Sequence, residues 1–309
     1  MKTPMLSRRH ALMSAAALPL LGALPRPARA AADMLGASQA QFNRFKLGQF
    51  EVTALLGGTR TVEEPNKIFG LNATPEEFAA ASAANYIPTD KAQFFFTPTL
   101  VNTGAELVLF DTGVGAAPLV AAMAAAGYAP EQVDVVVLTH MHGDHIGGVM
   151  GDAGPTFANA RYVTGAAEHN HWMGAANENF DKAVRPLNDK FTFLDDAGTV
   201  VSGITAQAAF GHTPGHMIYR IESAGQQLAI TADTANHYVW SLAYPDWEVS
   251  FDNDKAAAAA SRRAVFGMLA ADKVPFIGYH MPFPAMGYVE AREDGFRYVP
   301  ATYQMMLNG

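Results

Sequence analysis

The feature that most constrains this chain is a run of ten residues at 139–148, THMHGDHIGG. It places four candidate metal ligands within six residues: His140, His142, Asp144 and His145. Neutral imidazoles and a carboxylate suit zinc, and also manganese, iron or cobalt. A solvated loop could carry these residues by chance, but so dense a cluster of ligand types at metal spacing is rare. The run therefore predicts a metal site.

The residues before this run predict a buried strand. Positions 133–138 read VDVVVL, and a β-branched apolar segment of this length is typical of a strand interior. The ligands then follow the strand in a loop, where a rigid scaffold can hold them. Gly143, Gly147 and Gly148 allow the tight turns that would aim several side chains inward.

Three later motifs extend the pattern: GHTPGH at 211–216, Asp233 in ITADT, and His280 in IGYH. Alone, the first could be an ordinary Pro-Gly turn, and a lone His280 could be a core or surface residue. Together with the run at 139–148, and in this order, they resemble the metallo-β-lactamase superfamily. The resemblance covers roughly residues 50–300.

This resemblance implies an α/β fold, a four-layer αβ/βα sandwich, and a centre for two divalent metal ions. Zinc is the first candidate, with manganese, iron or cobalt as alternatives. One ion is expected to bind His140, His142 and His212. The other is expected to bind Asp144, His145 and His280. The carboxylate of Asp233 is expected to bridge the two ions.

The chemistry that the resemblance implies is hydrolysis by a metal-bridging hydroxide. Two neighbouring metal ions can lower the pKa of a shared water to about 7 and stabilise charge on the substrate oxygen. No protein nucleophile is then needed. Asp144 is also a catalytic candidate, because it could orient the water or take up its proton. His216 is expected to support the ligands, whereas His169, His171 and His237 have no assigned role.

Single residues set aside some branches of the superfamily and favour others. Di-iron oxygen-reducing members usually carry Glu in the place of His142, and thiolate-dependent β-lactamases need a cysteine, which this chain lacks. Segments 245–247, 251–254 and 280–287 resemble the methyl parathion hydrolase group. Asn236 stands where quorum-quenching lactonases commonly have Tyr. We therefore expect a lactone, ester or organophosphate hydrolase. A mononuclear iron persulfide dioxygenase and a non-catalytic metal-binding protein are the alternatives.

Composition limits the partners. The net charge is -8 and no Lys/Arg stripe is present, so a nucleic-acid substrate is disfavoured. The expected partner is a small molecule, and the sequence also permits a homodimer. Six aromatic residues are candidates for an apolar pocket or for the core: Phe94, Phe95, Phe96, Trp172, Trp240 and Phe283.

The N-terminus predicts an export signal at 1–30. SRRHAL at 7–12 resembles a twin-arginine motif, an apolar stretch spans 11–24, and ARA at 28–30 is a candidate cleavage site. A membrane anchor is the alternative, but the apolar stretch is short for a span. Residues 31–309 are then expected to form one hydrolase domain in the periplasm or outside the cell, without a stable membrane anchor.

Periodicity and turn residues predict the remaining elements. Strands are expected at 50–56, 94–97, 107–110, 199–207, 216–222, 227–231 and 274–277. Helices are expected at 72–85, 116–126, 165–173 and 255–271, with Thr74 and either Asn253 or Asp254 as N-caps. Asp111-Thr112-Gly113 is expected to be a turn. The same tripeptide is the aspartic-protease signature, but such proteases pair two aspartates and this chain has one such tripeptide.

Overall fold

The structure is a computed structural model that describes residues 33–308. The chain divides into two compact units, Met1–Ser38 and Gln39–Gly309. In the first unit, residues 33–38 are exposed and form no helix or strand. The predicted export signal at 1–30 lies outside the described residues. Among the helices of residues 33–308, none has the length and apolarity needed to cross a membrane.

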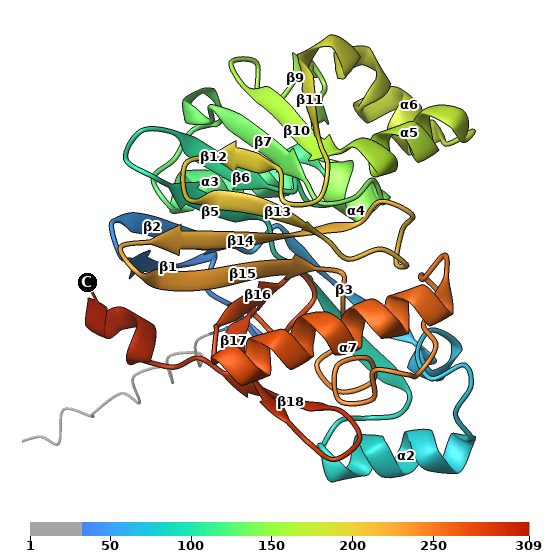
Figure 1. The fold of residues 1–309 in the computed structure, drawn as a ribbon. Coiled ribbons are helices and arrows are strands. Elements are labelled where there is room, and N and C mark those ends of the chain that lie inside the picture. Colours follow the sequence, from blue (N-terminus) through green and yellow to red (C-terminus); the bar gives the residue numbers. More distant parts are fainter. Residues whose placement is uncertain (1–32, 309) are drawn as a thin grey trace, which may run out of the picture. The chain divides into compact units, whose positions relative to one another are not determined.

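Two seven-stranded sheets form the centre of the second unit (Figure 1). The first has the order β1-β2-β5-β6-β7-β10-β11, and the second runs from β12 to β18 in sequence order. The strands of the first sheet are β1 Phe42–Leu47, β2 Phe50–Leu55, β5 Thr99–Asn102, β6 Leu107–Phe110, β7 Val135–Leu138, β10 Arg161–Gly165 and β11 Phe191–Leu194. Those of the second are β12 Thr199–Val201, β13 Ile204–Ala208, β14 Met217–Ser223, β15 Gln226–Ala232, β16 Phe276–Gly278, β17 Met286–Ala291 and β18 Phe296–Pro300.

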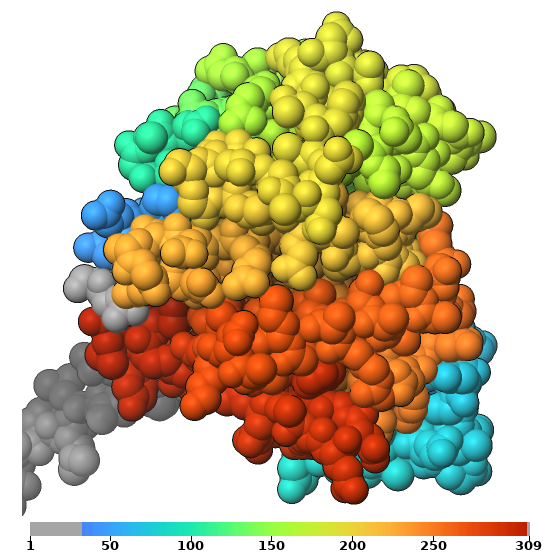
Figure 2. Space-filling model, in the orientation of Figure 1, coloured from blue at the N-terminus to red at the C-terminus, as the bar shows by residue number. Residues whose placement is uncertain are grey.

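The helices are α2 Pro75–Ala84, α3 Ala116–Ala125, α4 Gly143–Ile146, α5 Ala166–Gly174, α6 Glu178–Ala183 and α7 Lys255–Asp272. Four of them, α3, α5, α6 and α7, cover the outer faces of the two sheets, whereas Phe78 of α2 belongs to a separate core described below. Side chains of α3, α5 and α6 share a core with the first sheet, whereas α7 packs on the second. Figure 2 shows α7 as an orange band across this face of the molecule. Short 3-10 turns lie at Pro65–Lys67, Pro130–Gln132, Arg185–Lys190 and Gln304–Asn308.

Strand β7 shows why the sequence gives four layers. Val135 and Val137 belong to the core between the two sheets, whereas Val136 and Leu138 belong to the core under α3 and α5. Side chains alternate between the faces of a strand, so a strand buried on both faces is apolar throughout. The predicted αβ/βα sandwich is confirmed.

Several predicted elements have different limits in the structure. The single strand expected at 199–207 is wrong: β12 and β13 pair antiparallel, and Gly203 adopts a φ of 83° in the turn between them. This left-handed conformation favours glycine. The expected loop after β7 also contains the short helix α4, which begins at Gly143. Strand β6 and the N-cap Thr74 of α2 are as predicted.

A separate two-stranded ribbon lies beside the sheets. It consists of β3 Gly58–Glu63 and β4 Lys91–Phe96, and a smaller hairpin pairs β8 Met150–Gly151 with β9 Gly154–Pro155. Phe94 and Phe96 of the ribbon pack in a third core with Phe69, Phe78 and Trp240. This core therefore fixes the ribbon next to the strand ends that carry the predicted ligands.

Candidate metal centre

All seven predicted ligands follow the ends of strands. His140 and His142 lie just after β7, and Asp144 and His145 lie in the single turn of α4. The other three come from the second sheet. His212 lies in the turn between β13 and β14, Asp233 directly follows β15, and His280 lies two residues after β16. The structure therefore brings ligand candidates from both sheets to one place.

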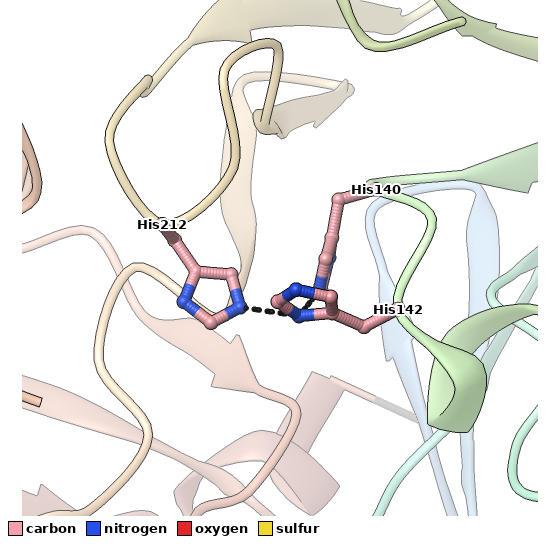
Figure 3. A group of neighbouring side chains, drawn as sticks. All are labelled: His140, His142 and His212. Atoms are coloured by element: carbon pink, nitrogen blue, oxygen red, sulfur yellow. Dashed lines mark hydrogen bonds between the residues drawn. The ribbon is translucent and has the colours of Figure 1, made fainter. Parts of the chain in front are cut away.

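Three histidines form the first group (Figure 3). The Nδ1 atom of His142 lies 3.1 Å from Nε2 of His140 and 3.0 Å from Nε2 of His212. The ligand atoms of the three residues all lie within 4.8 Å of one another. Three nitrogens this close and facing one another can bind a single divalent cation.

The second group consists of Asp144, His145 and His280, whose ligand atoms also lie within 4.8 Å of one another. The Oδ2 atom of Asp144 is 3.7 Å from Nε2 of His145 and 3.4 Å from Nε2 of His280. The Asp144 side chain is the most accessible of the three at 29% exposure, so it faces the cavity described below.

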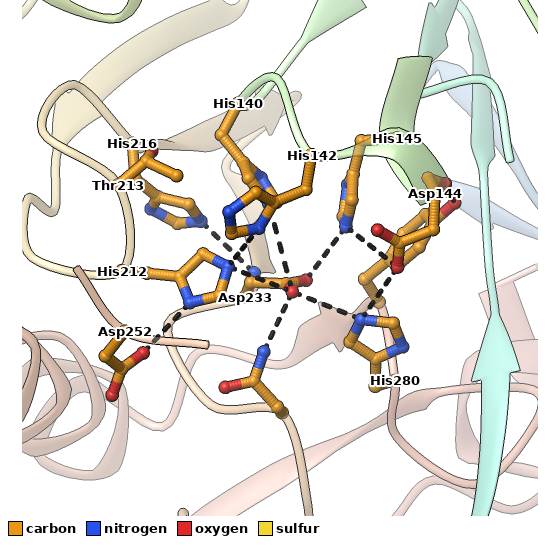
Figure 4. A network of polar contacts seen from close by, with 12 residues as sticks. His140, His142, Asp144, His145, His212, Thr213, His216, Asp233, Asp252 and His280 are labelled. Carbon is orange, nitrogen blue, oxygen red and sulfur yellow. Dashed lines mark hydrogen bonds and ion pairs between the residues drawn. The ribbon is translucent and has the colours of Figure 1, made fainter. Parts of the chain in front are cut away.

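Asp233 contacts both groups (Figure 4). Its Oδ2 atom lies 3.3 Å from Nε2 of His212 and 3.1 Å from Nε2 of His280, and its Oδ1 atom lies 3.2 Å from Nε2 of His145. Burial raises the pKa of this carboxyl, but His280 and His145 outweigh burial and hold the pKa well below its usual range. Asp233 is therefore an anion placed between the two groups.

The donor set fits divalent cations. The buried Nε2 of His145 and the buried Oδ1 of Asp233 lie 3.2 Å apart, but neither has a hydrogen-bond partner among the described residues. Unpaired buried polar atoms cost free energy, so atoms left free at one point indicate a missing partner. Imidazole nitrogens and carboxylate oxygens are suitable ligands for zinc and related ions. The residues present therefore fit the two-metal centre that the resemblance implies.

Asp111 supports one histidine in each group. Its carboxylate accepts hydrogen bonds from the backbone N–H and the hydroxyl of Thr139, at 2.8 and 2.9 Å. It also lies 2.8 Å from Nδ1 of His145, and the Thr139 hydroxyl lies 3.1 Å from Nδ1 of His140. A proton on each Nδ1 leaves each Nε2 lone pair free to face the centre. Asp111 is buried within this network, which gives no support to the aspartic-protease alternative.

A second buried carboxylate supports His212. Asp252 lies 2.9 Å from His212 Nδ1 and accepts a 2.9 Å hydrogen bond from Arg262, which is 0% exposed on α7. Burial alone would lower the pKa of His212, but hydrogen bonds with Asp233 and Asp252 raise it to about 9. His280 is supported by a backbone group instead of a carboxylate. The carbonyl oxygen of Phe95 lies 2.9 Å from Nδ1 of His280.

His216 has a supporting position, as expected. Its Nε2 accepts a hydrogen bond from the backbone N–H of Asp233 at 3.1 Å, and its Nδ1 donates to the Ala209 carbonyl at 3.2 Å. Burial lowers the pKa of His216 to about 3, so the ring stays neutral. The remaining histidines lie outside the ligand groups. His169 is buried against Asn188, at 2.7 Å, and His171 is exposed.

Sequence reasoning missed four supporting residues: Asp111, Glu168, Asn236 and Asp252. Asn236 donates a 2.8 Å hydrogen bond to Oδ2 of Asp233. For Asp111 a signal was present, since it directly follows β6, a strand that pairs with β7, which precedes the metal motif.

A cavity of about 1010 Å³ opens onto the centre. Asp144, Asp233 and His280 form part of its wall, together with the aromatic rings of Phe94 and Phe96. Two of the six aromatic candidates therefore line this cavity. Phe95 and Trp240 line a smaller neighbouring cavity of about 340 Å³, and Trp172 is buried in the core.

Comparison with known proteins agrees with this site. The sequence matches the Metallo-beta-lactamase superfamily over residues 97–275. No curated protein matches the chain significantly. With the fold and the His/Asp cluster, the match shows that the chain belongs to the metallo-β-lactamase superfamily. It is a metal-dependent hydrolase.

Solved structures include similar hydrolases. AidC, described as a dizinc quorum-quenching lactonase in complex with the product N-hexanoyl-L-homoserine, is 27% identical, with a TM-score of 0.79 over 85% of this chain and 98% of that chain. The hydrolase AbOPH is 24% identical, with a TM-score of 0.79 over 87% of this chain and 100% of that chain. AiiA of B. thuringiensis is 16% identical, with a TM-score of 0.58 over 78% and 99%. The last two similarities concern the fold alone.

Proposed function

We propose that this chain is a dinuclear metal hydrolase that opens an ester bond in a small molecule, with a lactone as the first candidate substrate. The observation that carries the proposal is the position of Asp233, whose carboxylate contacts His212 in one ligand group and His145 and His280 in the other. A single carboxylate between two groups of ligands is suited to two cations rather than one.

In this proposal, the first group of histidines holds one ion. The second group, Asp144, His145 and His280, holds the other, and Asp233 lies between them. When bound, the two ions would acidify a shared water and polarise the bond to be broken. Zinc is the first candidate, because the site offers imidazole and carboxylate ligands and no thiolate.

The remaining steps belong to the protein. Asp144 is the most accessible carboxylate of the centre, and it is placed to orient the attacking water and to accept its proton. Phe94 and Phe96 provide an apolar wall for the part of the substrate that does not react. The supporting carboxylates Asp111 and Asp252 keep the histidine rings oriented, so the site is organised before the substrate binds.

The choice of a lactone rests on the similarity to AidC, which is described as a lactonase. The sequence also resembles the methyl parathion hydrolase group, so a phosphotriester is the second candidate. This chain has Asn236 at a position where quorum-quenching lactonases commonly have Tyr. Its amide is bonded to Asp233 and is therefore not directed at a substrate.

Hydrolysis assays test the proposal. The purified, zinc-loaded enzyme is given N-hexanoyl-homoserine lactone, 4-nitrophenyl acetate and a dimethyl 4-nitrophenyl phosphotriester. We expect the highest kcat/KM with the lactone and a loss of at least a hundredfold in the Asp144→Asn variant. Faster phosphotriester turnover would move the substrate class to organophosphates. No turnover of any of the three, with one iron per chain, would favour the dioxygenase alternative.

We also propose that residues 1–30 direct the chain out of the cytoplasm and are then removed. The support is the sequence pattern alone, SRRHAL followed by an apolar stretch and ARA. Fractionation of expressing bacteria and N-terminal sequencing test this. A periplasmic protein that begins at Ala31 is the expected result, and a cytoplasmic protein that retains the leader would contradict it.

A further inference from the structure

Glu168 on α5 is a buried carboxylate with no part in the ligand set. It is 0% exposed, and a buried anion is costly unless its oxygens are paired. Its Oε1 accepts hydrogen bonds from the Met141 N–H at 2.9 Å and the Trp172 indole N–H at 2.6 Å. Its Oε2 accepts from the Thr213 hydroxyl at 2.7 Å and the Gly215 N–H at 2.9 Å. Three of these donors are N–H groups, which cannot accept a hydrogen bond, so this set of partners suits a carboxylate acceptor.

These donors connect Glu168 to both loops that supply the first ligand group. Met141 lies between His140 and His142, and Thr213 follows His212. The second group is held differently, because His145 contacts Asp111 and His280 contacts a backbone carbonyl. The run at 139–148 also supplies Asp144 and His145, but the hydrogen bond of Glu168 to this run is made at Met141, between two ligands of the first group. Glu168 makes no hydrogen bond to Asp111 or Phe95, which orient ligands of the second group.

The close approach of Gly215 shows how tightly the second loop sits on α5. A Cβ added at Gly215 would lie 2.0 Å from the backbone nitrogen of Glu168 and 2.5 Å from its Cα. No side chain fits at that distance, so glycine is required there. The loop carrying His212 therefore rests directly on the helix backbone.

Trp172 extends the connection to His142. In His142 the nitrogen that faces away from the centre is Nε2, and it makes no hydrogen bond among the described residues. The other four histidine ligands each have a polar partner at the nitrogen that faces away, which is Nδ1 in His140, His145, His212 and His280. Instead, the His142 ring lies edge-on to Trp172, at 5.9 Å between centroids and 85° between planes. The indole N–H of Trp172 is fixed by Glu168, so packing on an anchored ring orients His142.

We propose that Glu168 is a positioning residue that sets the metal affinity of the His140/His142/His212 group and leaves that of the Asp144/His145/His280 group largely unchanged. The inference rests on the proposed two-metal function. The mechanism is geometric: one carboxylate aligns both loops and, through Trp172, the His142 ring. Its negative charge also lies behind a site that would hold a cation.

The test compares metal binding by the wild type, Glu168→Gln and the exposed control Glu76→Gln. Zinc per chain is measured by elemental analysis, and stepwise affinities are measured by competition with a chelating dye. Gln keeps the shape but has one oxygen and a donor NH₂ group where four donors converge. We expect one of the two zinc affinities to fall by about ten- to a hundredfold in Glu168→Gln and neither to change in Glu76→Gln. In the cobalt-substituted variant, the visible absorption of one ion should be lost while that of the other remains.

The outcomes separate this inference from the proposed function. Two zinc ions with wild-type affinities in folded Glu168→Gln, or equal weakening of both, would overturn the inference and leave the proposed function intact. A wild type with one metal would contradict the dinuclear proposal, and unchanged affinity for that metal in Glu168→Gln would then overturn the inference too. If Glu168→Gln does not fold, Thr213→Val and Trp172→Phe each remove one donor. Unchanged affinities in both would overturn the inference.

Discussion

At the scale of single residues, the centre depends on side chains that touch the predicted ligands from behind. Asp111 shows this most clearly, since it contacts His145 directly and reaches His140 through Thr139. A ligand whose second nitrogen is bonded has a fixed tautomer and ring orientation. One buried carboxylate thus prepares a ligand in each group.

The variant Asp111→Asn tests this role. The amide retains the size of the side chain but must present an NH₂ group toward donors at Thr139 or His145, so one hydrogen bond is lost. We expect metal affinity to fall by about ten- to a hundredfold, measured by dye competition. Asp272→Asn, at an exposed position on α7, is the control and should bind metal normally. Normal binding by Asp111→Asn would show that its hydrogen bonds do not orient the ligands.

His237 gives a prediction about pH. Burial lowers its pKa to about 3 in the folded protein, against about 6.5 when unfolded. Between pH 3 and pH 6.5 the unfolded state binds more protons than the folded state. The contribution of His237 to the free energy of unfolding is therefore complete near pH 7 and declines as the pH falls below about 6.5. At pH 5, this one residue lowers the free energy of unfolding by about 2 kcal/mol relative to pH 7.

Urea unfolding of metal-free protein at pH 7 and pH 5 measures the effect. The variant His237→Phe should lose less stability between the two pH values than the wild type. At pH 7 it should also be less stable, because Nδ1 of His237 accepts hydrogen bonds from the N–H groups of Val239 and Trp240. His171→Phe, at an exposed position, should keep the wild-type pH dependence. Identical pH dependence in all three proteins would contradict this account of His237.

At the scale of elements, α7 acts on the centre from a distance. Its N-cap Asp254 accepts a hydrogen bond from the Ala257 N–H at 3.0 Å, and Arg262 in its buried face bonds Asp252, which contacts His212. The same helix therefore carries one residue that stabilises the helix alone and one that also supports a ligand.

Two variants of α7 should separate these effects. Asp254→Ala should lower the free energy of unfolding by about 1 kcal/mol with normal metal content. Arg262→Met should lower it by roughly 3–5 kcal/mol, because the buried carboxylate of Asp252 loses its ion pair with Arg262 and keeps only its contact with His212. It should also weaken metal binding through His212. Thermal unfolding measures the stability of each variant, and elemental analysis measures its metal binding. Equal metal binding by the two variants would refute the link through Asp252.

The sequence predicted the elements and ligands that depend on neighbouring residues. Thr74 and Asp254 cap helices near the expected positions, and the ligands at 140–145 lie after the expected strand. Partners from distant segments could not be predicted, because nothing in the spacing relates Glu168 to Thr213 or Asp252 to His212. Nine strands were also missed, because their pairing depends on neighbours in the sheets rather than on local pattern. They are β1, β3, β5, β8, β9, β10, β11, β17 and β18.

At the scale of the whole second unit, the centre joins the two sheets. Loops of the first sheet supply His140 and His145, and loops of the second supply His212, Asp233 and His280. Ions bound there would link the sheets and would stabilise the folded state by mass action.

Removal of metal should therefore destabilise the protein. With zinc at a thousandfold excess over its dissociation constant, the folded state gains about 4 kcal/mol per site. We expect a chelator to lower the melting temperature by several degrees and added zinc to restore it. An unchanged melting temperature after the metal has been shown to leave would contradict a centre that links the sheets.

The claim that most of the account depends on is a centre for two metal ions bridged by Asp233. Elemental analysis of the purified mature protein, supplied with zinc and then dialysed, tests it most directly. We expect two zinc ions per wild-type chain and no more than one in Asp233→Ala, which removes the carboxylate that contacts both groups. One ion per chain in the wild type, or two tightly bound ions in Asp233→Ala, would contradict the bridged dinuclear centre.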